Sequence, residues 1–154
     1  MIKIHTIGGD NTDMKSFMED AVKNAISFLE KEGAIPPQIF AFKDGKVNVA
    51  FARDRYTIRR AIDMFRSMDV EWIVVLCLAK FRTYANPPKK YRYGQVLKDP
   101  VSKECLYVSG TTRDGQHVAE FYEIVKLESG RYKVIKSERE ELKKIGGFLI
   151  PDPW

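Results

Sequence analysis

The stretch VEWIVVLCLAKF, residues 70–81, decides the fold of this chain. Its side chains are apolar almost without alternation, and the β-branched Val and Ile among them favour extended backbone. A strand with one face in water alternates apolar and polar residues, whereas a strand covered on both faces shows a continuous apolar run. We therefore predict that 70–81 is the central strand of a sheet and the heart of the core.

Two amphipathic helices are predicted before this strand, at about 12–32 and about 55–68. In both, apolar residues recur at the i, i+3, i+4 and i+7 spacing that places them on one helix face. The first helix has N-cap oxygens at 11–13 and Gly33 as a left-handed stop, and Asp54 is the N-cap of the second. Each apolar stripe must be buried against the sheet.

Turn residues mark the other strands of the sheet. Asp44-Gly45 joins two of them, and both residues tolerate the positive φ of a type I′ turn. Asp114-Gly115 and Ser129-Gly130 separate three more strands after the central one. The predicted ranges are about 38–43, 46–52, 103–112, 117–127 and 131–136.

These elements predict an α+β fold: a largely antiparallel sheet of about six strands with two amphipathic helices, in the order α-β-β-α-β-β-β-β. The length of 154 residues suits a single domain over 1–154. Within it we expect a long loop at 83–100, a short C-terminal helix near 138–144 and an apolar tail at 145–154. The element order resembles profilin-like and roadblock-like domains, an analogy of fold that carries no function.

Positive charge is concentrated in two segments of a chain whose net charge is +5. Residues 80–103 hold seven basic residues and one acid, and residues 53–66 hold five arginines and two aspartates. The rest of the chain is mildly acidic. Concentrated positive charge attracts anions, and nucleic acids are large polyanions with one charge on every phosphate.

The first basic segment alternates cationic and aromatic side chains. Lys and Arg neutralise phosphates, and aromatic rings stack on unpaired bases at about 1–3 kcal/mol per base. The alternative is a solvated loop whose tyrosines pack back on the sheet while its lysines face water. The residues predicted to bind a single-stranded nucleic acid or another polyanion are Lys80, Arg82, Tyr84, Lys89, Lys90, Tyr91, Arg92 and Tyr93.

The second basic segment coincides with the second predicted helix. Arg55, Arg59 and Arg66 fall within about 40° of one another on a face distinct from the apolar stripe, at 100° per residue. We predict that this face adds phosphate contacts to those of the loop. The alternative is that the arginines form ion pairs with the neighbouring acids Asp54, Asp63, Asp69 and Glu71, or with acids elsewhere in the chain.

Metal and nucleophile chemistry finds little support in the sequence, and we predict no metal, no cofactor and no catalytic residue. The two histidines, His5 and His117, lie far apart, and neither cysteine belongs to a C-x-x-C motif. If Asp114-Gly115 centres a hairpin, His117 lies opposite residue 112 and not opposite Cys105, which disfavours a Cys-His dyad. A carboxylate site for a metal-dependent nuclease would use strand glutamates, which otherwise form cross-strand ion pairs. These are Glu104, Glu120 and Glu123.

The C-terminal tail has two interpretations. Its apolar side chains either cover an edge of the sheet within the same chain or dock on a partner subunit. The second interpretation predicts a homodimer. The residues concerned are Phe148, Leu149, Ile150 and Trp154.

One segment carries a resemblance to a known family. It contains Lys98-Asp99-Pro100, Ser102-Lys103-Glu104, Leu106-Tyr107-Val108 and the turn Thr112-Arg113-Asp114-Gly115. The pattern is similar to one in a family of small uncharacterised prokaryotic and phage proteins, over about residues 70–127. In that family an acidic-Trp pair commonly ends the preceding strand, whereas Glu71-Trp72 opens it here. The resemblance implies a small domain and leaves its activity open.

Three functions remain after these exclusions. The favoured one is a non-enzymatic binding protein with a basic-aromatic loop for nucleic acid. The second is a protein–protein interaction module that forms a homodimer, and the third is a metal-dependent hydrolase or nuclease. We expect a cytoplasmic protein without a membrane span, because no run of about 18 apolar residues occurs and the two cysteines form no disulfide framework.

Overall fold

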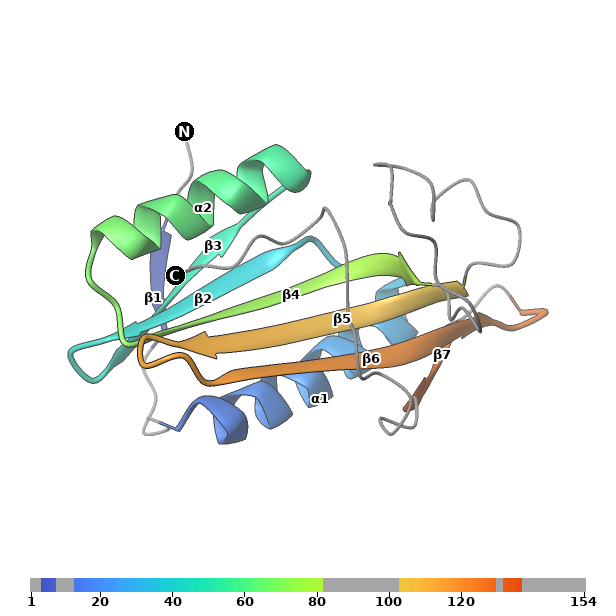
Figure 1. Ribbon diagram of the computed structural model, residues 1–154. Coiled ribbons are helices and arrows are strands. Elements are labelled where there is room, and N and C mark those ends of the chain that lie inside the picture. Colours follow the sequence, from blue (N-terminus) through green and yellow to red (C-terminus); the bar gives the residue numbers. More distant parts are fainter. Residues whose placement is uncertain (1–3, 8–12, 82–102, 130–131, 137–154) are drawn as a thin grey trace, which may run out of the picture.

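Seven strands form one sheet in the computed structural model, which describes residues 4–7, 13–81, 103–129 and 132–136 (Figure 1). The α+β prediction is confirmed, with one strand more than the expected six. The added strand is β1, which pairs with β3 at one edge of the sheet. The helices are α1 Met14–Glu32 and α2 Arg55–Ser67, and the strands are β1 Ile4–Ile7, β2 Gln38–Lys43, β3 Lys46–Phe51, β4 Trp72–Phe81, β5 Lys103–Thr112, β6 His117–Lys126 and β7 Tyr132–Lys136.

The strand order is β1-β3-β2-β4-β5-β6-β7, and every neighbouring pair is antiparallel. β4 lies between β2 and β5, so the prediction of a central strand is confirmed. Because β3 and β4 both run antiparallel to β2, they are parallel to each other. The chain passes from β3 to β4 through α2, which makes a β-α-β crossover over β2.

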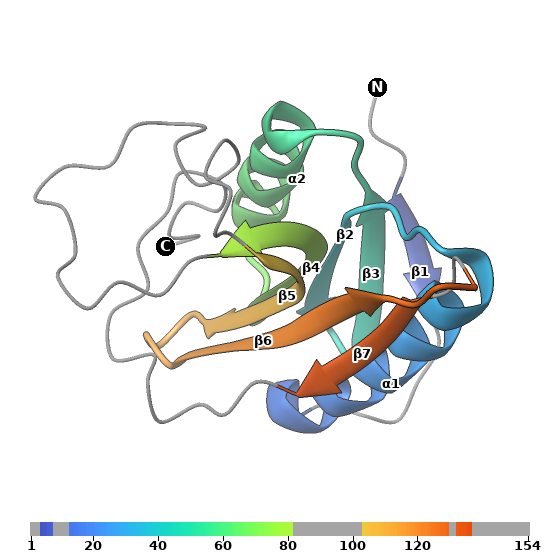
Figure 2. The same ribbon diagram turned by 90° about the vertical axis from the view of Figure 1, so that its right-hand side faces the viewer.

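The two helices cover opposite faces of the sheet (Figures 1 and 2). Alternate residues of β4 serve the two cores, which explains why its sequence is apolar throughout. Trp72, Val74 and Leu76 belong to the core under α1, while Ile73 and Val75 belong to the core under α2. Each helix buries one stripe, as the 3.6-residue period predicts.

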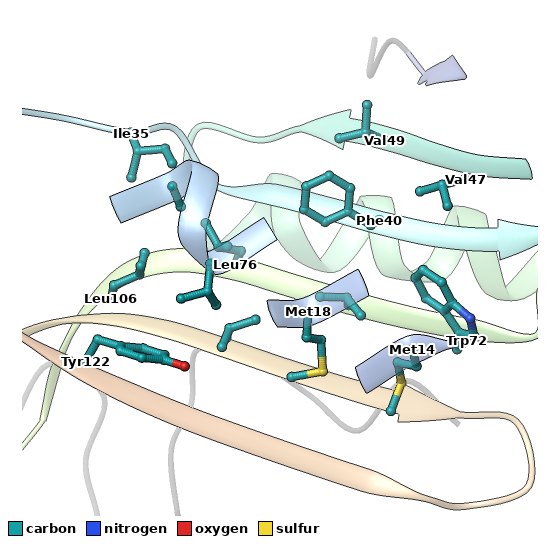
Figure 3. Packing of buried hydrophobic residues seen from close by; sticks show 14 of the residues in the cluster. Met14, Met18, Ile35, Phe40, Val47, Val49, Trp72, Leu76, Leu106 and Tyr122 are labelled. Carbon is teal, nitrogen blue, oxygen red and sulfur yellow. The ribbon is translucent and has the colours of Figure 1, made fainter. Parts of the chain in front are cut away.

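The α1 helix begins and ends where its sequence predicts. The Asp13 carboxylate accepts a hydrogen bond from the Ser16 backbone N–H at 3.0 Å, and Gly33 has a φ of 79°, which only glycine adopts without steric cost. Figure 3 shows Met14 and Met18 of α1 above the sheet, with Trp72 and Leu76 among the side chains beneath them. Trp72 also stacks on Phe42, with ring centroids 5.5 Å apart.

The β2–β3 turn matches its prediction, and the β5–β6 turn corrects one. Asp44 and Gly45 have φ values of 51° and 75°, as a type I′ turn requires. In the second hairpin, His117 faces Thr111, so its predicted position opposite residue 112 was wrong by one residue.

The cause of that shift is the length of the loop. The Thr112 N–H donates to the Gln116 carbonyl at 2.8 Å, which leaves three residues, Arg113 to Gly115, in the loop instead of two. Gly115 takes the positive φ of 96° that a three-residue hairpin loop places at its last position.

Several predictions fall outside the residues that the structure describes. These are the helix near 138–144, the tail at 145–154 and the whole of the loop at 83–100. Of the helices in the described part of the chain, neither has the length and apolar character needed to cross a lipid bilayer.

Candidate polyanion-binding surface

The α2 helix carries most of the basic side chains that the structure describes near the predicted site. Its start is fixed by a capping box at Asp54 and Thr57. The Asp54 carboxylate accepts from the Thr57 backbone N–H at 2.9 Å, and the Thr57 hydroxyl oxygen accepts from the Asp54 N–H at 3.0 Å. This pair of hydrogen bonds sets the orientation of the first turn, which holds Arg55.

The arginines lie on one flank of α2. Its buried stripe consists of Ile58, Ala61, Ile62 and Phe65, which pack on the sheet. At 100° per residue, the direction shared by Arg55, Arg59 and Arg66 lies about 90° from the centre of this stripe. Arg59 and Arg66 are exposed, and Arg55 is partly exposed.

The crossover determines which side of α2 this flank faces. Viewed along the strands, α2 lies on one face of the sheet, with β1 on one side of it and β5 and β6 on the other (Figure 2). When α2 is in front of the sheet and β3 and β4 point upwards, β4 lies to the right of β3 (Figure 2). The β3-α2-β4 connection is therefore right-handed. With this hand, helical geometry turns the arginine flank towards β4 and β5 and away from β1. The flank therefore overlooks the two strands that bound residues 82–102.

The beginning of α2 and the end of β4 lie towards the same end of the sheet. Since β3 and β4 are parallel, α2 starts just after β3 ends, at the level of Leu76, and β4 continues beyond that level to Phe81 (Figure 1). Backbone pairing sets Lys80 opposite Glu104 of β5. The other predicted loop residues lie outside the described residues: Arg82, Tyr84, Lys89, Lys90, Tyr91, Arg92 and Tyr93. The described ends of the two basic segments thus lie towards the same end of the sheet.

Two of the four acids next to the arginine flank, Asp54 and Asp69, have other partners. Hydrogen bonds from Thr57 hold the pKa of Asp54 below its ordinary value, and Asp69 forms an ion pair with Arg113. Arg66 does pair with Asp63, at 4.0 Å with both side chains exposed, so the ion-pair alternative is confirmed for Arg66. An exposed pair at that distance contributes about 0–1 kcal/mol and leaves Arg66 available to a stronger anion.

Tyr56 is a residue of this surface that the sequence-based prediction missed. Its side chain is 66% exposed, and the guanidinium carbon of Arg55 lies 4.9 Å from the centre of its ring. The helical wheel contained the signal: Tyr56 lies about 170° from the buried stripe, so an aromatic ring was to be expected in solvent beside the arginines.

The two cysteines are buried, which keeps their thiols protonated and poorly nucleophilic. Burial raises the pKa of the thiols of Cys77 and Cys105 to about 12, from an ordinary value of 9.0. Cys105 faces Glu123 across the hairpin, whereas the Nδ1 atom of His117 lies 2.9 Å from the Thr111 hydroxyl. The observed register therefore places Cys105 and His117 opposite different residues and keeps them apart.

The three strand glutamates do not converge. The alternation of β5 and β6 places Glu104 and Glu120 on the α1 side of the sheet and Glu123 on the α2 side. Glu120 accepts a hydrogen bond from the Tyr122 hydroxyl on its own strand. Across residues 4–7, 13–81, 103–129 and 132–136, no three His, Cys, Asp or Glu side chains form a group able to hold a metal ion.

The described fold and surface define an α+β protein with an arginine-rich helix over one face of an antiparallel sheet. No protein-family model, no curated protein and no solved structure that was compared with the chain matches it. The similarity over residues 70–127 to small prokaryotic and phage proteins thus stays a prediction. The same holds for the homodimer, since Phe148, Leu149, Ile150 and Trp154 lie outside the described residues.

Proposed function

We propose that this chain is a non-enzymatic binding protein for polyanions, with single-stranded nucleic acid as the favoured ligand. The binding surface would consist of the arginine flank of α2 and residues 80–93. The observation that carries the proposal is the flank itself: three arginines on one side of a helix whose neighbouring acids Asp54 and Asp69 are engaged by Thr57 and Arg113.

The spacing of the arginines suits an extended phosphate backbone. Arg55 and Arg66 are separated by about 16 Å along the helix axis, with Arg59 between them. An arginine guanidinium donates two parallel hydrogen bonds to a phosphate and keeps its charge at every physiological pH. A helix with such a row offers a rigid line of contacts to several successive phosphates of one strand.

The position of the flank supports a joint surface with the loop. The arginines face β4 and β5, and α2 begins on the side of the sheet towards which β4 runs to Phe81 and from which the chain returns at Lys103. Basic side chains from residues 82–93 would then extend the same positive field. Binding by charge of this kind releases counterions from the nucleic acid, so the affinity falls steeply as salt increases.

The first test measures the salt dependence of binding by fluorescence anisotropy with a labelled oligo(dT). Each phosphate contact on a single strand contributes roughly 0.7 to the slope of log K against log salt. We expect the double variant Arg55→Ala/Arg59→Ala to lower the magnitude of the slope by about 1.4 and to weaken binding by about tenfold or more near 100 mM salt. The matched control is Lys15→Ala/Lys23→Ala, which removes two exposed charges from α1 on the opposite face and should change little.

A second variant tests the loop. Lys89→Ala/Lys90→Ala/Arg92→Ala should weaken binding by well over tenfold, because three phosphate contacts are lost together. An unchanged affinity would remove the loop from the surface. If the wild-type protein shows no salt-dependent binding to single-stranded DNA, RNA or polyphosphate, the proposed function is wrong.

A further inference from the structure

Tyr56 has the greatest exposed fraction of the exposed large apolar side chains in the described part of the chain. Its side chain is 66% exposed, compared with 49% for Phe28 and 48% for Phe51. The ring lies in solvent on the side of α2 opposite to its apolar stripe, which is fully buried. An aromatic ring held in water beside cations is a feature of surfaces that stack on unpaired bases.

The ring is held in place by its neighbour. The Arg55 guanidinium lies over the face of the Tyr56 ring, 4.9 Å from its centre, in a cation–π arrangement. Both residues occupy the first turn of α2, which the Asp54–Thr57 capping box fixes. The ring therefore has a limited range of orientations before any ligand arrives, which reduces the entropy lost on binding.

The position of the ring relative to the arginines matters for its role. On the helical wheel, Tyr56 lies about 80° from the centre of the arginine flank and points away from the sheet. A strand whose phosphates follow Arg55 and Arg59 would bring its bases to the outer side of the helix, where Tyr56 lies. Phosphates and bases of one strand could then be contacted by adjacent faces of one helix.

We infer that Tyr56 is a base-stacking residue of this surface and that it makes the protein prefer single-stranded nucleic acid to polyanions that have no bases. The inference rests on the proposed function and deepens it, since the arginines alone attract any polyanion. A stacked base adds roughly fivefold to a hundredfold in affinity. Polyphosphate or a strand without bases gains nothing from the ring.

The experiment compares three probes by fluorescence anisotropy, each in direct binding or in competition. They are oligo(dT) of about 12 nucleotides, an abasic strand of the same length, and inorganic polyphosphate. Tyr56→Ala should weaken binding to oligo(dT) by at least fivefold and leave the other two affinities unchanged. Its salt slope with oligo(dT) should match that of the wild type, because no charge has been removed.

Two further variants separate stacking from other effects. Tyr56→Trp keeps an aromatic ring and should retain the wild-type affinity for oligo(dT). Phe28→Ala removes an exposed ring from α1, on the opposite face of the sheet, and should not change any affinity. Circular dichroism of Tyr56→Ala should show an unchanged fold, since the side chain is exposed and alanine favours helix.

The outcomes distinguish this inference from the proposed function. If the wild-type protein binds all three probes equally and Tyr56→Ala changes nothing, the stacking role is wrong and polyanion binding stands. If Tyr56→Ala weakens binding to all three probes, Tyr56 acts by positioning Arg55 and the stacking role is again wrong. If the wild-type protein binds none of them, the proposed function and the stacking role both fail.

Discussion

Gly110 of β5 lies so close beneath Met18 of α1 that a β-carbon added at Gly110 would be 2.6 Å from the Met18 sulfur. The same carbon would lie 2.8 Å from the sulfur of Met14. Both methionines are buried, so α1 approaches β5 closely only because this position has no side chain. The two methionine side chains therefore fill the space that a side chain at position 110 would occupy.

Substitution of Gly110 should therefore destabilise the protein. We expect Gly110→Val to reduce the free energy of unfolding by about 2–3 kcal/mol, because adding methyl groups to a filled core costs about 1–3 kcal/mol. Chemical denaturation measures the loss. In a Met18→Ala background the same substitution should cost less, which a double-mutant cycle would detect. Equal costs in both backgrounds would show that Met18 is not the obstacle.

The capping box of α2 should make stability depend on pH in the acid range. The Thr57 hydrogen bonds hold the pKa of Asp54 below its ordinary value of 3.8, so the carboxylate stabilises the folded state above that pH. The stabilisation is lost as the pH falls through the lowered folded-state pKa. Asp54→Ala should thus lower the melting temperature by a few degrees at neutral pH, with a difference that shrinks under strongly acid conditions.

The control for this prediction is Asp54→Asn. Asparagine also caps helices but carries no charge. Asp54→Asn should therefore lose less stability at neutral pH than Asp54→Ala, and the stabilisation by the asparagine cap should not change with pH. A difference between Asp54→Ala and the wild type that stays constant down to acid pH would contradict the role of the charge.

The buried thiols should make the protein sensitive to alkali. Burial raises the pKa of Cys77 and Cys105 to about 12, while in the unfolded chain they ionise near 9.0. The folded state keeps these protons, so stability is full below the unfolded-state pKa and falls as the pH rises from there towards the folded-state pKa. Each thiol contributes up to about 1.4 kcal/mol per pH unit to this decline.

The measurement is denaturant unfolding of the wild type and of Cys77→Ala/Cys105→Ala over the alkaline range. The double variant should show a shallower decline, whatever its absolute stability. In the native protein at about pH 8, both thiols should react slowly with a disulfide reagent and quickly after unfolding. Fast labelling of the native protein would show that the thiols are accessible.

The aromatic cluster under α1 should contribute strongly to stability. Trp72 packs on Phe17 and Phe42, with ring centroids 5.1 Å and 5.5 Å away, and is almost fully buried. Trp72→Ala should cost about 3–5 kcal/mol, whereas Trp72→Phe should cost less. Phe51→Ala removes a ring that is 48% exposed and serves as the comparison. Similar costs at both positions would contradict the packing of Trp72.

Local sequence signals were sufficient for most of the fold. Asp44-Gly45, Asp54 and Gly33 determine their turn and helix ends through backbone conformations and hydrogen bonds that involve only near neighbours. The strand Ile4–Ile7 was missed because it has only four residues and is held by β3, whose paired residues lie 40 to 46 positions away. The order in which strands meet likewise depends on distant contacts that no local pattern records.

The candidate surface was predictable only in part. The 3.6-residue period was enough to gather Arg55, Arg59 and Arg66 on one flank. Which way that flank faces depends on the hand of the β3-α2-β4 crossover, a property of the folded chain (Figure 2). The same helical wheel could have predicted that Tyr56 is exposed, but its contact with Arg55 could be seen only from the side-chain positions in the structure.

The central position of β4 affects how the chain folds while it is synthesised on the ribosome. One edge of β4 can pair with β2 once Phe81 has emerged from the ribosome. The other edge pairs with β5, which is synthesised only after residues 82–102. The packing of α1 is also incomplete at that stage, because part of its apolar stripe packs on β5 and β7. A nascent chain at that stage presents its most apolar strand to other nascent chains, so we expect truncated products that end before Lys103 to aggregate or to require a chaperone.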